Sequence, residues 1–180
     1  MKKELKVQNI VASTFLAHDI PLIKLAETLS NTEYNPEQFP GLVMRIKEPK
    51  TSALIFSSGK VVCTGAKSMA KVRESVVQII KNIAKIGIRI RIKPVIKIQN
   101  MVASGDVNMD LNLNRLAMKL ENTEYEPEQF PGLVYKLSGT RATFLLFSNG
   151  KIVCTGTTSE TKLREAVVKL VKILKQTEKK

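Results

Sequence analysis

Short stretches in which every second residue is apolar recur along the chain, and longer stretches with apolar residues every three or four positions separate them. The first spacing is typical of half-buried strands and the second of amphipathic helices. In the first strand pattern, residues 5–13, the alternation places Val7, Asn9 and Val11 on one face. These patterns predict an α+β protein whose strands pair mostly antiparallel through short hairpins.

Capping and helix-breaking residues set the limits of these elements. Asp19 is expected to cap the first helix, with Pro21 in its first turn, and Gly87 ends a longer helix that begins after Ser68. Residues 88–93 form a predicted extended connector, and residues 176–180 a frayed polar tail. The spacings predict helices at 22–29, 68–87, 111–120 and 159–175, and strands at 5–13, 42–47, 51–57, 60–65 and 96–104, with three further strands before the last helix.

The whole pattern occurs twice. Residues 31–43 read Asn-Thr-Glu-Tyr-Asn-Pro-Glu-Gln-Phe-Pro-Gly-Leu-Val, and residues 122–134 repeat them with one substitution. At this offset of 91 residues, positions 6–86 align with 97–177 without a gap, and about half of the pairs are identical. Solenoid arrays need three or more repeats. Two copies instead predict a pseudo-twofold fold, in which residues 1–93 and residues 94–180 are the two halves of one continuous structure.

One face of the predicted sheet carries more apolar residues than an exposed face should. Two helices in each half can cover only one face of the sheet, and the other face is then normally polar. Here that second face carries Leu54, Phe56 and Val62, and the second half repeats all three. An exposed apolar face marks an interaction surface. The alternative is that a second layer or a dimer partner covers it.

The charge of the chain indicates what kind of partner to expect. Its net charge of +13 favours a polyanion, most often nucleic acid and less often a membrane surface. The alternative is that the lysines serve solubility alone. No apolar run is long enough to cross a bilayer, and the first four residues show no signal-peptide pattern. Cys63 and Cys154 are repeat mates, which argues against a disulfide between them and suits a reducing compartment.

Patterns of catalytic and metal-binding residues are missing from the sequence. The single histidine, His18, falls in a predicted turn, and its repeat mate is Met109. No Cys or His cluster has the spacing of metal ligands, and Gly59 lacks the upstream glycine of a phosphate loop. We therefore expect a protein that is not an enzyme and that uses no metal or other cofactor.

The repeated aromatic residues are candidates for contacts with DNA. Phe39 and Phe56 recur as Phe130 and Phe147, and paired Phe side chains on an apolar face can wedge between base steps through the minor groove. The alternative is that they belong to the core. Phe39 and Phe130 each lie between Gln and Pro-Gly in a turn-rich segment, where core residues are less common.

Repeated polar and basic residues are the second group of candidates. Asn9 and Asn100 place an amide on an otherwise apolar strand face, which is costly unless the amide finds a partner. That partner would be an acceptor of an A·T pair in a minor groove or, alternatively, a group within the sheet. Thr64 and Thr155 offer a hydroxyl in the same way. Six basic residues keep their sign between repeats and would either meet phosphates or form a solvated surface: Arg45, Lys50, Lys60, Lys136, Arg141 and Lys151.

Four duplicated motifs carry a resemblance to a known family. They are Gln-Asn-(Ile/Met)-Val-Ala-Ser, Glu-Tyr-x-Pro-Glu-Gln-Phe-Pro-Gly-Leu-Val, Leu-(Ile/Leu)-Phe-Ser-x-Gly-Lys and Val-Cys-Thr-Gly. Together they resemble the TATA-box-binding protein (TBP) family in its archaeal form, over essentially the whole chain. The resemblance implies a saddle, in which a curved ten-stranded antiparallel sheet carries four helices on its convex face and binds a widened minor groove with its concave face. TBP is itself a standard example of minor-groove wedging.

The resemblance also implies a role for individual residues. The wedging rings and the prolines that support them would be Phe39, Pro40 and Phe56 at one end of the site, and Phe130, Pro131 and Phe147 at the other. The residues that read central A·T pairs would be Asn9, Thr64, Asn100 and Thr155. The apolar residues on the groove floor would be Val11, Leu54, Val62, Val102, Leu145 and Val153. Transcription factor B would dock on the second stirrup through Glu126, Glu128 and Gln129.

The implied function is a general transcription initiation factor that binds TATA-box promoter DNA as a monomer, with a dimer conceivable when it is free. It would bend the DNA and recruit factor B and, through it, RNA polymerase. It is expected to be associated with the nucleoid in the cytoplasm of an archaeon, or to be nuclear if the source is a eukaryote. Two departures from the family stand out: Gly65-Ala66-Lys67 becomes Gly156-Thr157-Thr158, and this chain is basic where archaeal relatives are often acidic. The basic charge should strengthen nonspecific DNA binding, or it reflects the salinity or temperature of the host.

Two other functions fit part of the pattern. A TBP-like fold can serve as an accessory module that binds DNA nonspecifically or as a protein–protein adaptor. Such modules usually lie in longer chains and lose the paired Phe and Asn residues, which this chain keeps. An RNA-binding sheet of the RRM type would need an aromatic motif that is missing here.

Overall fold

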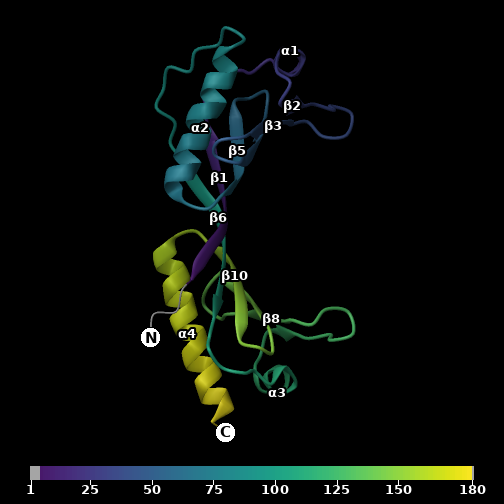
Figure 1. Ribbon diagram of the computed structural model, residues 1–180, viewed down its shortest axis with the longest axis vertical. Helices are drawn as coiled ribbons and strands as arrows, with labels where there is room; N and C mark the ends of the chain where they lie inside the picture. Colours follow the sequence, from purple (N-terminus) through teal and green to yellow (C-terminus); the bar gives the residue numbers. More distant parts are fainter. Residues whose placement is uncertain (1–4, 180) are drawn as a thin grey trace. The chain divides into compact units, whose positions relative to one another are not determined.

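The structure is a computed structural model that describes residues 5–179, and within them it contains ten strands and four helices. The strands are β1 (Lys6–Phe15), β2 (Thr32–Glu33), β3 (Leu42–Ile46), β4 (Thr51–Ile55), β5 (Lys60–Ala66), β6 (Lys97–Asp106), β7 (Thr123–Glu124), β8 (Leu133–Lys136), β9 (Thr143–Leu146) and β10 (Lys151–Thr157). The helices are α1 (Leu22–Thr28), α2 (Met69–Ala84), α3 (Leu113–Lys119) and α4 (Glu160–Glu178). The strands form one sheet in the order β2-β3-β4-β5-β1-β6-β10-β9-β8-β7, so each half repeats the same arrangement (Figure 1). The predicted fold class, a duplicated antiparallel sheet with four helices, is confirmed.

The chain divides into two compact units. One unit is residues 9–99, and the other combines residues 5–8 with residues 100–179. The start of β1 therefore packs with the second repeat, where Leu5 and Val7 contact the buried cluster. The prediction that Val7 shares a face with Asn9 and Val11 is wrong, because Val7 packs against the buried cluster of one unit, whereas Asn9 and Val11 belong to the other unit.

In the unit formed by residues 9–99, α2 packs on one face of β3, β4 and β5 (Figure 1). The Ser68 side chain caps the helix by accepting a hydrogen bond from the Lys71 amide at 3.2 Å. Apolar residues then recur at helical spacing, and Val72, Ile79 and Ile83 are buried against the sheet. Because α2 covers only this face, the alternate residues of the three strands point away from it.

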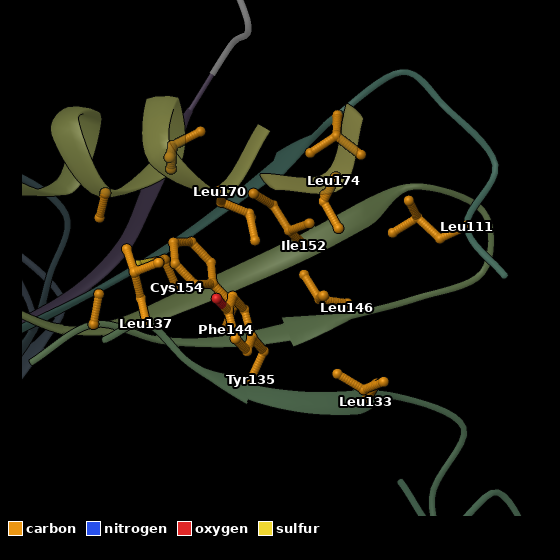
Figure 2. Packing of buried hydrophobic residues seen from close by; sticks show 14 of the residues in the cluster. Leu111, Leu133, Tyr135, Leu137, Phe144, Leu146, Ile152, Cys154, Leu170 and Leu174 are labelled. Atoms are coloured by element: carbon orange, nitrogen blue, oxygen red, sulfur yellow. The ribbon is translucent and has the colours of Figure 1, made fainter. Parts of the chain in front are cut away.

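The second unit repeats this packing around α4. Figure 2 shows Phe144, Ile152 and Cys154 on the sheet facing Leu170 and Leu174 of α4. Phe144 is fully buried at 0 % exposure, yet its repeat mate is the small residue Ala53. The two cores therefore share a plan but differ in their packing.

Several predicted boundaries differ from those in the structure. Asp19 does not cap α1: Pro21 is the capping residue, and no side chain bonds to the first turn. Asn112 caps α3 instead, accepting from the Arg115 amide at 3.0 Å. Helix α4 runs to Glu178, beyond the predicted end at 175, so residues 176–178 are helical and not a frayed tail. The residue spacings did not locate the short strands β2 and β7, which complete the ten strands that the resemblance implied. Each pairs at the edge of the sheet, at the start of the turn segment. Two further predictions concern residues outside the described part of the chain. They are the absence of a signal peptide, which was judged from residues 1–4, and the end of the polar tail at residue 180.

Candidate nucleic-acid interface

A row of apolar side chains crosses the face of each unit that the long helix leaves uncovered. In the first repeat the row is Val43, Leu54 and Val62, which are direct cross-strand neighbours on β3, β4 and β5. In the second repeat the equivalent row is Val134, Leu145 and Val153 on β8, β9 and β10. All six side chains are partly exposed, as are Val11 and Val102 on β1 and β6. The prediction omitted Val43 and Val134, although the alternation with the buried Leu42 and Met44 would have identified Val43.

Each row is bordered by a pair of phenylalanine rings. Phe39 lies in the loop between β2 and β3, and its ring meets that of Phe56 edge to face, with centroids 5.9 Å apart. Phe130 and Phe147 form the equivalent pair at 6.0 Å. Phe39 and Phe130 are 43 % and 44 % exposed, so these two residues do not belong to the core. Edge-to-face pairing stabilises such rings and holds them in a defined orientation.

A glycine beneath each ring pair is needed to place it. At Gly41 an added Cβ would lie 2.8 Å from Phe39 Cε1 and 3.1 Å from Phe56 Cε1. At Gly132 the same positions of Phe130 and Phe147 lie at 2.8 and 3.1 Å. Any side chain at these two positions would displace the rings, which explains why the repeated segment keeps glycine there. Pro40 and Pro131 precede the glycines and are exposed beside the rings.

The repeated asparagines bind the sheet itself. Asn9 Oδ1 accepts a hydrogen bond from the Gly65 amide at 2.7 Å, and Nδ2 donates to Thr64 Oγ1 at 3.2 Å. Asn100 does the same with the Gly156 amide at 2.8 Å and with Thr155 Oγ1 at 3.0 Å. Gly65 and Gly156 have φ values of +99° and +92°, in the region that favours glycine. Each lies at a bulge in its strand, which turns its amide out of the regular ladder of hydrogen bonds.

This geometry fixes the orientation of each amide. A backbone N–H can only donate, so the atom that faces Gly65 or Gly156 must be the asparagine oxygen. The Nδ2 group then has one hydrogen on the threonine, and within residues 5–179 its second hydrogen has no partner. A structural bond and an available donor therefore coexist on the same side chain.

Replacing Asn100 by Leu is expected to lower the free energy of unfolding by about 1–2 kcal/mol, because the partly buried Gly156 amide loses its acceptor. Asn100→Asp keeps an acceptor oxygen and should stay close to the wild-type stability. The midpoints of urea denaturation of the three proteins test this. Equal midpoints for the Leu and Asp variants would show that the bond to Gly156 contributes nothing.

The predicted basic residues border the uncovered face in different ways. Lys60, Lys136 and Lys151 are exposed at the ends of their strands, and Arg45 Nη2 lies 3.4 Å from Glu33 Oε2. Both partners of that ion pair are more than half exposed, so the pair adds little stability, and Arg45 can exchange Glu33 for another anion. Arg141 differs, because it lines a cavity beside α4.

An open hollow of about 820 Å³ brings Phe147, Lys151 and Val153 together with the unpredicted residues Lys6 and Ser104. Ser104 Oγ accepts a hydrogen bond from Gln8 Nε2 at 2.8 Å, and Ser13 accepts the equivalent bond from Gln99. These Gln–Ser pairs come from the repeated Gln-Asn-x-Val-Ala-Ser motif, which could have indicated them. Phe15 was also omitted; it is 56 % exposed and is the cross-strand neighbour of Lys60.

The predicted partner-binding residues lie together in the loop between β7 and β8. Glu126, Glu128 and Gln129 are all exposed, and the Glu126 carbonyl accepts from the amides of Gln129 and Phe130 at 3.0 Å each. These two bonds fold the loop into a tight turn that also sets the position of Phe130. Glu126 is the one residue of the repeated segment that differs from its mate, Asn35, so this loop carries an extra carboxylate.

The part of the chain that the structure describes offers no group of three or more His, Cys, Asp and Glu residues that could hold a metal ion. None of its helices is both long and apolar enough to cross a bilayer.

Cys63 and Cys154 are free, buried thiols, as the repeat predicted. Burial raises the pKa of the Cys154 thiol to about 11 and also raises the pKa of Cys63, so neither is a reactive thiolate near neutral pH.

Comparison with known proteins identifies the family. A family model described as Transcription factor TFIID (or TATA-binding protein, TBP) matches residues 4–86 and again residues 95–177. The chain belongs to the TBP family. The resemblance carried by the four duplicated motifs is thereby confirmed, and the two matches coincide with the repeat offset of 91 residues.

Similar members of the TBP family come from archaea. A TATA-box-binding protein of Archaeoglobus fulgidus is 51% identical over 169 residues, which cover 93% of this chain and 92% of the relative. One from Thermococcus kodakarensis is 49% identical over 173 residues, or 96% of this chain and 91% of the relative. The solved structure of Methanococcus jannaschii TBP is 47% identical, with a TM-score of 0.90 over 96% of this chain and 99% of that one. The TBP fold and the archaeal character of the sequence are therefore supported by sequence and by structure.

Proposed function

We propose that this chain is a general transcription initiation factor that binds the minor groove of A/T-rich TATA-box DNA and bends it. The observation that carries the proposal is the edge-to-face Phe pair in each repeat, with one ring exposed and the other partly exposed, which borders an uncovered apolar row. The names of the archaeal relatives support the same function. In this proposal the two repeats are residues 1–93 and 94–180 of one DNA-binding structure.

The Phe pairs would act as wedges between base steps. Inserting a ring unstacks a step at a cost of a few kcal/mol, which apolar contact with Val43, Leu54, Val62 and their mates offsets. Because each ring rests against a glycine and a second ring, little conformational freedom is lost on insertion. A flexible TA step deforms at a lower cost than a G·C step, so much of the sequence preference would come from the DNA rather than from base contacts.

The asparagines would provide the direct contacts. The free Nδ2 hydrogen of Asn9 or Asn100 can donate to adenine N3 or thymine O2, the acceptors on the minor-groove edge. Their oxygens already accept from Gly65 and Gly156, so they are less available to the N2 amino group of guanine. A G·C pair at these positions would place an unpaired donor against an apolar face, which is destabilising.

The charged rim and the second loop complete the proposal. Lys60, Lys136, Lys151 and Arg45 would neutralise phosphates and release counterions, which makes binding depend on salt. Glu126, Glu128 and Gln129 would form the docking site for transcription factor B, and through it RNA polymerase. The support for this is their shared exposure and the carboxylate that the first loop lacks.

A duplex labelled with a dye at each end tests the proposal. We expect the chain to shorten the end-to-end distance of a TATAAA duplex and to leave a G·C-scrambled duplex straight, and the bend should survive at salt concentrations that abolish nonspecific binding. Equal binding to both duplexes without a bend would overturn it. That result would instead favour the second candidate, an accessory module that holds DNA through its net charge of +13 alone.

A further inference from the structure

The two repeats place different chemistry at one position of the uncovered face, where Phe15 and Asp106 are repeat mates. Each is the last residue of the long strand of its repeat, β1 or β6. Phe15 lies directly across from Lys60, and Asp106 lies directly across from Lys151. The register is therefore the same in both repeats, but the first presents an exposed ring and the second a partly exposed carboxylate.

The Asp106 carboxylate has one oxygen available for a partner. Its Oδ1 accepts a hydrogen bond from the Asn108 amide at 2.7 Å. Within residues 5–179 no hydrogen bond reaches Oδ2 and no ion pair engages Asp106, yet Oδ2 is not a buried atom. Carboxylate oxygens are hydrogen-bond acceptors, so Oδ2 can accept from a donor outside the protein.

This acceptor lies beside one of the proposed wedges. Asp106 lines the open hollow of about 820 Å³ that also contains Phe147, Lys6 and Lys151. A carboxylate alone would be repelled by the phosphates of DNA, but two lysines in the same hollow offset that repulsion. In the proposed mode of binding, the base pair next to the step that Phe147 wedges would therefore meet a hydrogen-bond acceptor and not only apolar surface.

In the minor groove the only base-pair donor is the N2 amino group of guanine, because A·T pairs offer acceptors alone. We propose that Asp106 accepts a hydrogen bond from this amino group, so that the second repeat favours a G·C pair next to the step that Phe147 wedges. Phe15 has no acceptor, so the first repeat disfavours the same pair, whose amino group would lie unpaired against the ring. This inference rests on the proposed function and adds to it a base preference that differs between the repeats.

Replacing guanine by inosine tests this inference, because inosine pairs with cytosine but lacks the N2 amino group. TATAAA duplexes carry either G·C or inosine·C, in turn, at the pairs that border the core at each end, with the purine on either strand. Affinities are measured by fluorescence anisotropy at one salt concentration. At one end of the core we expect the wild type to bind the guanine duplex about tenfold more tightly than its inosine counterpart. At the other end guanine should bind no better than inosine.

Asp106→Asn is the variant that isolates the acceptor. A backbone N–H bonds only to an acceptor, so the Asn oxygen stays on the Asn108 amide and the NH2 group takes the place of Oδ2. This variant should fold as the wild type does and lose the preference for guanine over inosine. Asp110→Asn is the matched control, because it removes the same charge from an exposed residue outside the hollow, and it should keep the preference.

Phe15→Asp is the reciprocal change. Ala17 and Asn108 are repeat mates with φ values of +52° and +55°, so the same turn follows both strands. An aspartate at position 15 can therefore accept from the Ala17 amide as Asp106 does from Asn108. We expect Phe15→Asp to bring a preference for guanine over inosine to the other end of the core, and its absence would overturn the assignment to this position.

Bending of the TATAAA duplex without guanine at its borders is measured in the same samples, because it tests the proposed function separately. If that duplex bends and the preference for guanine is equal in the wild type and in Asp106→Asn, this inference fails while the proposed function stands. An equal rise in affinity for all duplexes in Asp106→Asn would also overturn the inference, because the carboxylate would then only repel phosphates.

Discussion

Phe147→Ala is expected to weaken binding to TATAAA DNA by about 2–4 kcal/mol, or roughly 30- to 1000-fold, which is the range for truncating an aromatic residue that is a binding hot spot. The ring is partly exposed and touches Phe130, so under the proposed mode of binding its removal takes away one wedge and the support of the other. The end-to-end distance change of a dye-labelled duplex should fall to roughly half, because only one of the two ends of the site remains wedged.

Two comparison variants make this result specific. Phe56→Ala removes the equivalent ring of the first repeat and should reduce bending by a similar amount, whereas Val168→Ala removes an exposed apolar side chain from α4 and should change nothing. The folded state of Phe147→Ala should remain within about 1 kcal/mol of the wild type, since most surface substitutions have small effects. A Phe147→Ala protein that bends DNA as the wild type does would contradict the role assigned to the rings.

The repeat explains why so much of this fold is predictable from sequence. Each half reports the same alternation independently, and the uncovered apolar faces with Leu54 and Leu145 follow from it directly. The exposed positions of Phe39 and Phe130 were likewise indicated by their setting beside Pro-Gly. These features depend on local sequence, and local sequence is what the repeat duplicates.

Features that depend on packing between distant segments were not predictable in this way. The sequence left open whether Asn9 binds the sheet or a partner; the structure shows a bond to Gly65, 56 residues away, which exists only because β5 bulges there. Eight of the eleven residues that line the cavity beside α4 differ from their repeat mates, and no single one of these differences indicates a cavity. Val7 was assigned to the wrong face because its packing partner is the other repeat.

Phe144→Ala is the substitution with the largest expected effect on stability. Phe144 is fully buried at 0 % exposure, between α4 and the sheet beside Tyr135 and Cys154 (Figure 2). Truncating a buried Phe costs about 3–5 kcal/mol, from lost transfer free energy and from the cavity that remains. Urea denaturation should show a correspondingly lower midpoint with little change in slope.

Ala53 is the repeat mate of Phe144 and is also buried, which would suggest that the second core tolerates alanine at this position. The neighbours of the two residues differ, however: Met44 stands where Tyr135 does, and Thr51 and Ser75 stand where the second repeat has two alanines. The first core is built around a small residue at this position and the second is not. Phe147→Ala, three residues along and partly exposed, is the matched control. A loss in Phe144→Ala no larger than in that control would mean that the second core relaxes to the packing of the first.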